Sequence, residues 1–269
     1  MYKAEILLDS INPLGVRLTT MKVTMPRFIL AEFNTHRVFS RNAASSRAIS
    51  VKRRIQMVTD HPFIPDVFGK NQRGMQADEA LQDKDAMYAE GTWILAAQAA
   101  TRFASTLETL GVHKQLANRI LEPFCWVDVI VSSTKWDNFF HLRDSNMAQP
   151  EMQIVAKAMR KALDDSTPQA KDRGEWHIPC GENLQGDLLR QLKAAAGRIA
   201  RVSYNAGSDD PDEDAALGER LVKDGHWSPF EHIAVVTQSS SASYNRNFGY
   251  GWDQFRAFLE GNPEWTPST

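Results

Sequence analysis

The longest stretch of uniform composition, residues 77–110, is rich in Ala, Leu, Glu and Gln. Because these residues have high helix propensity, the stretch predicts one long helix or two. Gly111 is a plausible stop for this helix, and residues 114–121 predict a second helix ahead of Pro123. The sequence therefore predicts a long helical hairpin in the middle of the chain.

Segments of strand character lie on both sides of this hairpin. Residues 4–10 and 17–24 predict two strands around a turn at 12–15, and residues 126–132 and 232–238 predict two more. Further helices are expected at residues 26–33, 136–142, 150–163, 188–202, 212–223 and 251–260, with an irregular connection at 166–186. The mixture predicts an α+β fold, in which a mixed or antiparallel sheet and its flanking helices form a single domain over residues 1–269.

The composition is ordinary for a globular protein. Of the 269 residues, 42% are hydrophobic and 24% are charged, so the chain can bury a sizeable core. Its formal net charge is −2. Proteins that bind duplex nucleic acid usually carry a basic excess, so no nucleic-acid partner is expected. Local basic clusters could still hold a small anion.

The two cysteines, Cys125 and Cys180, show neither metal-ligand spacing nor a disulfide framework. Cys125 lies in the apolar run 124–127 and is expected to be buried as a small hydrophobic residue, whereas Cys180 has no assigned role. A reducing cytosol is the natural compartment for such a chain. The N-terminal residues lack the apolar segment of a signal peptide, and no apolar stretch reaches the roughly 18 residues of a membrane span. We therefore expect a cytoplasmic protein without a membrane partner.

Residues 36–47 form the first segment that can carry chemistry. The segment holds three arginines, three serines, one histidine and one asparagine. Guanidinium groups bind phosphate through forked hydrogen bonds, and serine hydroxyls and loop amides can complete such a site. The wider polar stretch 40–50 is not expected to be core. The alternative interpretation of the whole segment is a solvated surface loop.

Two further arginines, Arg119 and Arg143, lie among apolar residues, and Asn138 precedes Arg143 on the same expected helix. A buried arginine needs an anionic or hydrogen-bonding partner, so each could bind a ligand. The alternative is a structural ion pair with a nearby Asp or Glu.

Residues 226–232 contain two histidines and one glutamate, but their spacing fits no standard metal site, so no metal is expected. The alternative interpretation of this segment is a turn with a capping serine ahead of a strand. The chain also lacks a glycine-rich phosphate loop and a Gly-x-Ser-x-Gly motif, and neither cysteine lies in the setting of an activated nucleophile.

Together these segments resemble a known family. Residues 35–37 (Thr-His-Arg), followed by seven residues and Ser45, resemble the signature of the flavin-dependent thymidylate synthases, which is Arg-His-Arg, seven residues and Ser. Ser40, Asn42 and Arg47 occupy their places in the signature, and residues 119–123, 138–143 and 148–151 resemble the family's middle segment.

The order of the motifs is unusual for that family. Segments similar to residues 200–203 (Ala-Arg-Val-Ser) and 225–232 (Gly-His-Trp-Ser-Pro-Phe-Glu-His) come before the signature in the family, but here they follow it. The chain therefore resembles a circularly permuted form of the fold, of the kind found in phages. Such a rearrangement is physically permissible because surface termini that lie close together can be joined and the chain reopened elsewhere.

The resemblance implies a set of site residues. It implies that Arg143 is catalytic, contacting the pyrimidine ring and helping to activate it. The residues implied on the nucleotide side are Glu32, Thr35, Ser45, Ser46, Arg47, Arg119 and Arg143. The residues implied to line the flavin site are His36, Arg37, Asn42, Ser132, Asn138, Ser203, His226, Ser228 and Glu231.

The resemblance also implies an activity: transfer of a one-carbon unit to C5 of a pyrimidine deoxynucleotide monophosphate, most simply dUMP to dTMP. FAD would be the cofactor, with NADPH and 5,10-methylenetetrahydrofolate as co-substrates, in a homotetramer with shared active sites. Three positions depart from the family pattern, with Thr35 for Arg, Glu32 for Gln and Ala43 for Glu. These departures leave open 5-hydroxymethylation of dUMP or dCMP, and a non-catalytic nucleotide- or flavin-binding protein.

Overall fold

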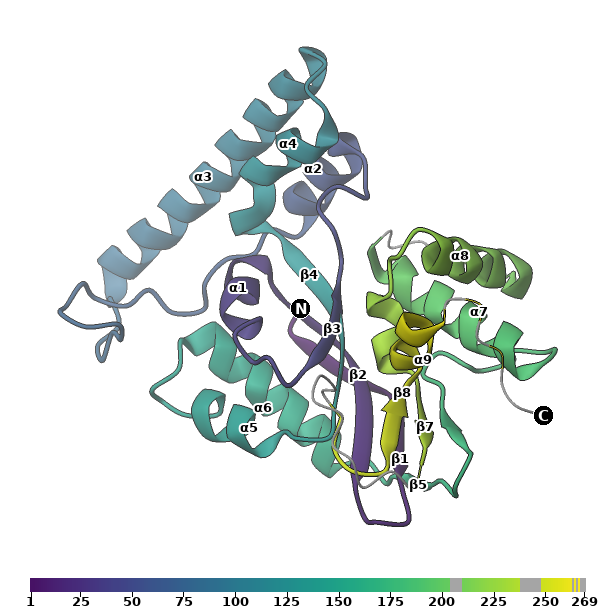
Figure 1. The fold of residues 1–269 in the computed structure, drawn as a ribbon. Helices are drawn as coiled ribbons and strands as arrows, with labels where there is room; N and C mark the ends of the chain where they lie inside the picture. Colours follow the sequence, from purple (N-terminus) through teal and green to yellow (C-terminus); the bar gives the residue numbers. More distant parts are fainter. Residues whose placement is uncertain (204–209, 238–247, 263, 265, 267–269) are drawn as a thin grey trace.

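The computed structural model describes residues 1–203, 210–237, 248–262, 264 and 266. A five-stranded sheet of order β3-β4-β2-β1-β5 forms the body of the molecule (Figure 1). Its strands are β1 (Lys3–Ile11), β2 (Arg17–Pro26), β3 (Ser40–Ala43), β4 (Trp126–Ser133) and β5 (Gln169–Ala170). All neighbouring strands are antiparallel except the short parallel pair β1 and β5. The sheet is therefore mixed, as the sequence predicts.

The β1–β2 hairpin closes through its predicted turn. The Asn12 side-chain oxygen accepts hydrogen bonds from the backbone N–H groups of Leu14 and Val16, both at 3.0 Å. Gly15 has a φ of +74°, a conformation that glycine adopts without steric cost. This turn sets the register in which Ile11 lies opposite Arg17, and an irregularity between Ile6 and Leu8 then shifts the register so that Lys3 lies opposite Thr24.

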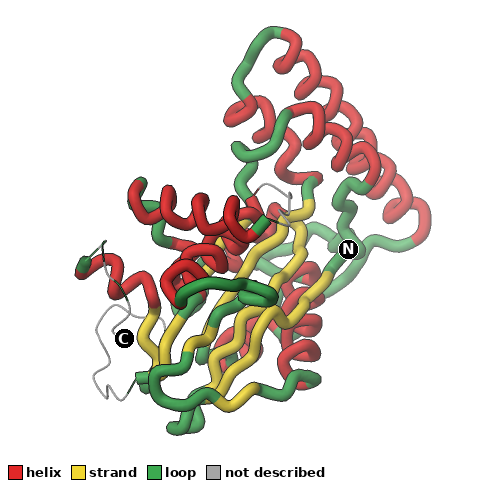
Figure 2. The backbone as a smooth tube through the Cα atoms, turned by 90° about the vertical axis from the view of Figure 1, so that its right-hand side faces the viewer, coloured by secondary structure: helices red, strands yellow, loops and turns green. Residues whose placement is uncertain are grey.

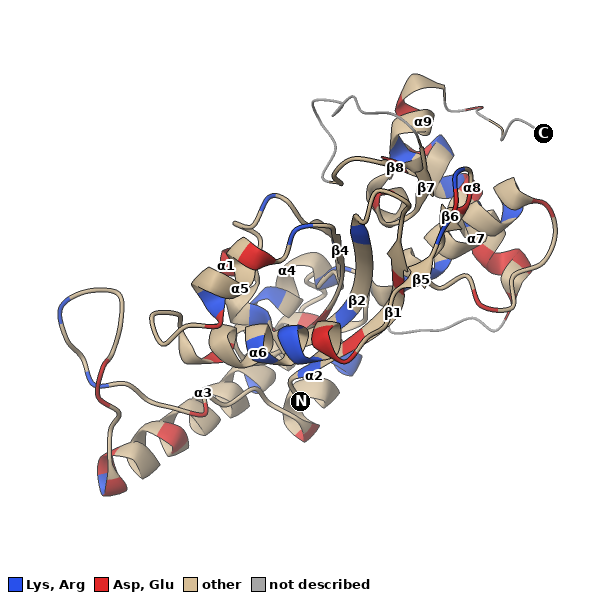
Figure 3. Ribbon diagram, turned by 90° about the horizontal axis from the view of Figure 1, so that it is seen from below, with Lys and Arg blue, Asp and Glu red and all other residues tan. Residues whose placement is uncertain are grey.

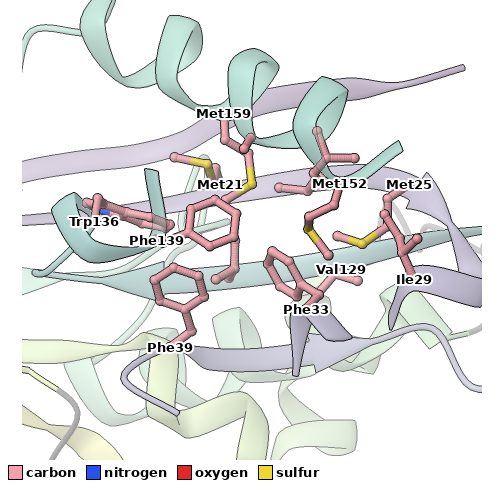
Figure 4. Packing of buried hydrophobic residues seen from close by; sticks show 14 of the residues in the cluster. Met21, Met25, Ile29, Phe33, Phe39, Val129, Trp136, Phe139, Met152 and Met159 are labelled. Atoms are coloured by element: carbon pink, nitrogen blue, oxygen red, sulfur yellow. The ribbon is translucent and has the colours of Figure 1, made fainter. Parts of the chain in front are cut away.

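One face of the sheet carries helices from the first two thirds of the chain. They are η1 (Arg27–Ile29) and α1 (Leu30–Phe33), α5 (Asp137–Arg143) and α6 (Pro150–Asp164), where η marks a 3-10 helix. Figure 4 shows Met21 and Val129 from the sheet packed against Phe139 of α5 and against Met152 and Met159 of α6. Successive residues of a strand point to opposite faces, so Ile130, which follows Val129, must pack on the opposite face of the sheet.

The opposite face is covered by the C-terminal part of the chain, so that helices flank the sheet on both sides (Figure 2). Ile130 packs there against a cluster that includes Leu192, Phe230 and Phe255. The helices of this layer are α7 (Leu188–Ala200), η3 (Arg201–Ser203), α8 (Pro211–Lys223), η4 (Ser228–His232) and α9 (Phe255–Gly261). A three-stranded sheet β6-β7-β8 completes it, with β6 (Trp176–His177), β7 (Ala234–Val236) and β8 (Trp252–Gln254).

The predicted helical hairpin projects from the body (Figure 1). It consists of α3 (Asp83–Thr109), which begins six residues later than predicted, with α4 (Lys114–Ala117) and η2 (Asn118–Phe124). Helix α2 (Val51–Asp60), which the sequence did not predict, packs against it. The long helix ends as predicted before Gly111, whose φ is +78°. The second helix is shorter than predicted, because after Ala117 the chain tightens into the 3-10 helix η2, which accommodates Pro123.

Several sequence predictions are corrected by these elements. The polar stretch 40–50 is not all loop, since its first four residues pair with β4 as strand β3. The connection 166–186 contains β5 and β6, and the segment predicted as a helix from 251 begins with strand β8. The strand predicted at 232–238 begins at Ala234, and residue 238 lies outside the described residues.

The described helices carry charged residues of both signs, in line with the formal net charge of −2. Acidic and basic residues occur together along α6 and α8 (Figure 3). Within the described ranges, no helix has both the length and the apolar character needed to cross a bilayer.

Candidate functional site

Arg143, the last residue of α5, lies in the first of three polar clusters. Its Nε–H donates to Nε2 of His36 at 2.9 Å, and its Nη1 forms an ion pair with Glu32 of α1. Glu32 and His36 lie on α1 and the turn that follows it. The packing of α5 and α1 on the same face of the sheet brings the three residues together.

His36 is buried between aromatic rings. Its ring lies 4.9 Å from that of Phe139 in an edge-to-face arrangement and 5.9 Å from that of Phe39 in a stacked one. Burial lowers the pKa of His36, and the nearby guanidinium groups of Arg143 and Arg41 lower it further. A neutral imidazole whose Nε2 accepts from Arg143 must carry its proton on Nδ1, so this tautomer is inferred from the contact.

The turn that holds His36 is fixed by side chains. Arg41 Nη1 donates to the backbone oxygens of Asn34 at 2.6 Å and His36 at 3.2 Å. The Thr35 hydroxyl donates to the backbone oxygen of Glu32 at 2.7 Å, so it stabilises the turn. Arg41 was missed as a positioning residue, although its place in the basic segment is a signal that could have drawn attention to it.

A second cluster gathers around the carboxylate of Glu122 in η2. This carboxylate accepts hydrogen bonds from Ser46 Oγ, from Arg27 Nε at 2.9 Å and from Arg119 Nη1 at 2.9 Å. Burial alone would raise the pKa of Glu122, but the bond from Ser46 and the two guanidinium groups lower it below its ordinary value. Arg27 also donates to the backbone oxygen of Ala44 at 2.9 Å, which ties loop 44–46 to η2.

The third cluster lines a pocket of about 550 Å³ between the hairpin and the C-terminal layer. Sequence-predicted site residues contribute much of its wall, namely Asn42, Ser45, Arg47, His226 and Ser228. Residues that the sequence did not single out complete it, among them His113, Gln115, Leu217 and Leu221. The wall therefore combines polar groups from two distant parts of the chain with an apolar patch on α8.

Asn42 joins these two parts. Its Nδ2 donates to the backbone oxygen of Ile199 in α7 at 3.0 Å, and its Oδ1 accepts from Ser228 Oγ at 3.3 Å. The segment 225–232 thus lies beside the 40–47 segment.

Comparison with known proteins places the chain in a family. A family model described as "Thymidylate synthase complementing protein" matches residues 13–169, more than half of the chain. The chain belongs to this family, the flavin-dependent thymidylate synthases. Structures of PolB from Streptomyces cacaoi, a UMP/dUMP methylase, bound with 5-Br UMP or 5-Br dUMP, are similar to 61% of this chain. Their identities are 17% and 15%, they are covered over 88% and 90% of their length, and both TM-scores are 0.49. A search of curated proteins found no match.

Not every residue implied by the family resemblance reaches a pocket in this thymidylate synthase homologue. Ser132 is completely buried, because its side chain points from β4 into the C-terminal layer, where it contacts His232 at 2.8 Å. Ser46 is also buried against Glu122, and Glu231 pairs with Arg256. In the single chain these three side chains have protein partners, and their assignment to ligand contacts stays a prediction.

Of the other residues implied for the flavin site, two lie at the surface and one has a side chain outside the described residues. Arg37 and Asn138 are exposed, and neither lines the pocket described above. The Ser203 side chain lies outside the described residues. Among the described residues, no group of three His, Cys, Asp or Glu side chains could hold a metal ion.

The arginines of this family member do not converge within one chain. Arg143 pairs with Glu32, Arg119 pairs with Glu122, and Arg47 lines the 550 Å³ pocket. Arg119 and Arg143 each form an ion pair with a glutamate, which is the alternative to ligand binding that the sequence left open. The nucleotide contacts implied by the resemblance thus require a bound ligand or another chain to bring these groups together.

Proposed function

We propose that this protein transfers a one-carbon unit from 5,10-methylenetetrahydrofolate to C5 of a pyrimidine deoxynucleotide, converting dUMP to dTMP with FAD as cofactor and NADPH as reductant. The observation that carries the proposal is the Arg143 cluster. In a chain that belongs to the flavin-dependent thymidylate synthases, the arginine expected at the pyrimidine ring is held in one orientation by His36 and Glu32.

Arg143 would act on the ring electrostatically. Carbonyl oxygens of a pyrimidine gain negative charge as C5 becomes nucleophilic, and a fixed guanidinium beside them stabilises that charge. The lowered pKa keeps His36 neutral, so the imidazole holds Arg143 without competing with it for an anion. No protein nucleophile is required.

The residues of the 550 Å³ pocket fit FAD. Its volume lies within the usual range of roughly 300 to 1,000 Å³ for ligand sites. Arg47 and His113 could meet the diphosphate, while Asn42 and Ser228 offer hydrogen-bonding groups beside an apolar wall that includes Leu221. FAD, when bound, supplies the hydride and one-carbon transfer chemistry, and the protein binds and orients the reactants.

A homotetramer with shared sites accounts for the separation of the arginines. The surface beside Arg119 is apolar, with Leu116 and Ile120 exposed by 62% and 37%. Contact through this surface would place Arg119 of one chain near the nucleotide site of another, where substrate phosphate could replace Glu122 as its partner.

A second candidate function is favoured by Glu32. Its carboxylate accepts hydrogen bonds and neutralises part of the Arg143 charge. A carboxylate at the ring suits the exocyclic amine of cytosine, which donates, better than the O4 oxygen of uracil, which accepts. This favours dCMP as substrate, with a methyl or hydroxymethyl product.

The test is product analysis with the full chain. Protein reconstituted with FAD is supplied with NADPH, methylenetetrahydrofolate and either dUMP or dCMP, and the product is identified by mass spectrometry. Arg143→Ala is expected to lower turnover about a hundredfold or more, because one preorganised donor to a developing anion contributes that much. Arg102→Ala, on the exposed face of α3, is the matched control.

The outcomes separate the candidates. Methylated dUMP supports thymidylate synthesis, and a modified dCMP supports the second function. Protein that binds nucleotide without oxidising NADPH is the non-catalytic alternative, and protein that takes up no FAD contradicts the proposal.

A further inference from the structure

Arg54 of α2 is a charged residue on the apolar face of its helix. It lies three residues after Val51 and four before Val58, so the three side chains share one side of the helix. Val51 and Val58 pack into the cluster between α2, α3 and η2. Arg54 is buried with them and is only 4% exposed.

The structure gives this buried cation no compensating charge. Within the described ranges, no carboxylate lies within 4.0 Å of the Arg54 guanidinium, and its buried Nε has no hydrogen-bond partner. Burial of an uncompensated guanidinium costs several kcal/mol, so an anionic partner is expected.

Cys125 is the polar neighbour of Arg54, but it does not supply the missing charge. Burial raises the pKa of the Cys125 thiol, and this effect outweighs the opposing influence of Arg54. The thiol is therefore neutral, and it donates to the backbone oxygen of Leu121 at 3.0 Å. Glu122 is also near Cys125, but its carboxylate is already shared by Arg27, Arg119 and Ser46.

Arg54 lines a pocket of about 270 Å³ that is separate from the three clusters described above. Its wall is largely apolar and includes Met57, Val58, Cys125 and Trp126. Asp60 also lines the pocket, but it is exposed and its carboxylate accepts from Gln56 at 2.6 Å. The volume is below the usual range of roughly 300 to 1,000 Å³ for drug-sized ligands, so only a small molecule fits.

We infer that Arg54 and this pocket form a binding site for a small organic carboxylate with an apolar body. A guanidinium matches a carboxylate through two parallel hydrogen bonds, and the apolar wall receives the rest of the molecule. Inorganic phosphate would satisfy the charge but would leave the apolar wall without a partner.

Calorimetric titration of the full chain with benzoate tests the inference, with benzamide as the neutral analogue and inorganic phosphate as the plain anion. Saturable binding of benzoate is expected, with benzamide and phosphate each about tenfold weaker or more. Arg54→Met should weaken benzoate binding by a similar factor. Lys52→Met, which removes an exposed cation from the same helix, should leave it unchanged.

Any of three titration results would overturn the site: no saturable benzoate binding, equal binding of benzamide, or phosphate binding tighter than benzoate. Undiminished benzoate binding by Arg54→Met would also overturn it. Arg54→Lys keeps a cation and should bind benzoate more weakly than the native chain, so a comparison remains if Arg54→Met does not fold.

A measurement of mass by sedimentation addresses the other source of a counter-ion. If Arg54→Met changes the oligomeric state, a carboxylate of another chain fills the pocket, and the small-ligand site is wrong. An unchanged oligomeric state together with lost benzoate binding supports the inference.

Discussion

Acidification should weaken the protein through two buried histidines that join the five-stranded sheet to the C-terminal layer. His177 of β6 contacts Ser10 Oγ at 2.8 Å through Nδ1 and Thr20 Oγ1 at 2.9 Å through Nε2. Ser132 Oγ lies 2.5 Å from Thr20 Oγ1 and 2.8 Å from Nδ1 of His232. Neither histidine is exposed to solvent.

Both imidazoles are neutral in the folded protein. Burial lowers the pKa of His177 from 6.5 to about 3, with smaller contributions from Lys171 and His232. Burial likewise lowers the pKa of His232 from 6.5 to about 3. Their neutral state thus contributes stability that is fully present above the unfolded pKa and decreases as the pH falls below it.

The magnitude follows from the pKa difference. As the pH falls from the unfolded pKa of 6.5 to about 5, each histidine lowers the free energy of unfolding by about 1.4 kcal/mol per pH unit. The two together should therefore remove about 4 kcal/mol from the free energy of unfolding at pH 5, a large part of the stability of a typical domain. The lowered pKa of His36 acts in the same direction, while the raised pKa of Glu151 opposes it.

Urea unfolding of the native chain and of His177→Asn at about pH 7.5 and pH 5 measures the effect. The variant should be less stable at the higher pH, since it loses buried hydrogen bonds, but it should lose about 2 kcal/mol less than the native chain between the two values. His141→Asn, exposed on α5, is the control. Equal pH dependence in the native chain and His177→Asn would refute the assignment of this stability to His177.

Three further substitutions test the packing of the C-terminal layer, the exposed face of α3 and the Arg143 cluster. A Cβ added at Gly218 would lie 2.1 Å from the backbone oxygen of Lys193, so Gly218→Ala should lower the free energy of unfolding by about 1–3 kcal/mol or more. Gly91→Ala on α3, where a Cβ meets nothing within 4 Å, should raise it by about 0.5–1 kcal/mol in the same urea experiment. Glu32→Gln removes the carboxylate that neutralises Arg143, so calorimetric binding of dUMP should become tighter, and the ratio of dCMP to dUMP affinity should fall. Unchanged affinity for both nucleotides would show that Glu32 does not face the ring.

The elements that local sequence dictates were predicted well. Strands β1, β2 and β4 and helices α5, α6 and α8 lie close to their expected ranges, because alternation, helix propensity and turn residues all act locally. Strand β3 was missed, since a polar segment becomes a strand only when the edge of β4 is there to pair with it. Strand β6 depends in the same way on its partner β7.

Sequence reasoning grouped some of the residues that the structure brings into one pocket and missed others. Asn42, Arg47 and Ser228 line one pocket. Their motifs are far apart in the chain, and only the resemblance to a family whose fold brings such motifs together allowed them to be grouped. Glu122 was not singled out, although it binds Ser46, Arg27 and Arg119. A carboxylate's partners are set by packing between η2 and distant loops, which no local pattern contains.

A carboxylate within reach of an arginine determines how readily that arginine can bind an anionic ligand, because the ligand must compete with the carboxylate. Arg119 and Arg143 have carboxylate partners, so an anionic ligand must displace or rearrange Glu122 or Glu32 to bind them. Within the described residues, Arg47 and Arg54 have no carboxylate within 4.0 Å, although one is exposed and the other is buried. Water can solvate the exposed guanidinium, whereas the buried one depends on a ligand or a neighbouring chain. Of these four arginines, Arg54 therefore has the surroundings that most require a partner, even though it lies outside the motifs that resemble the family signature.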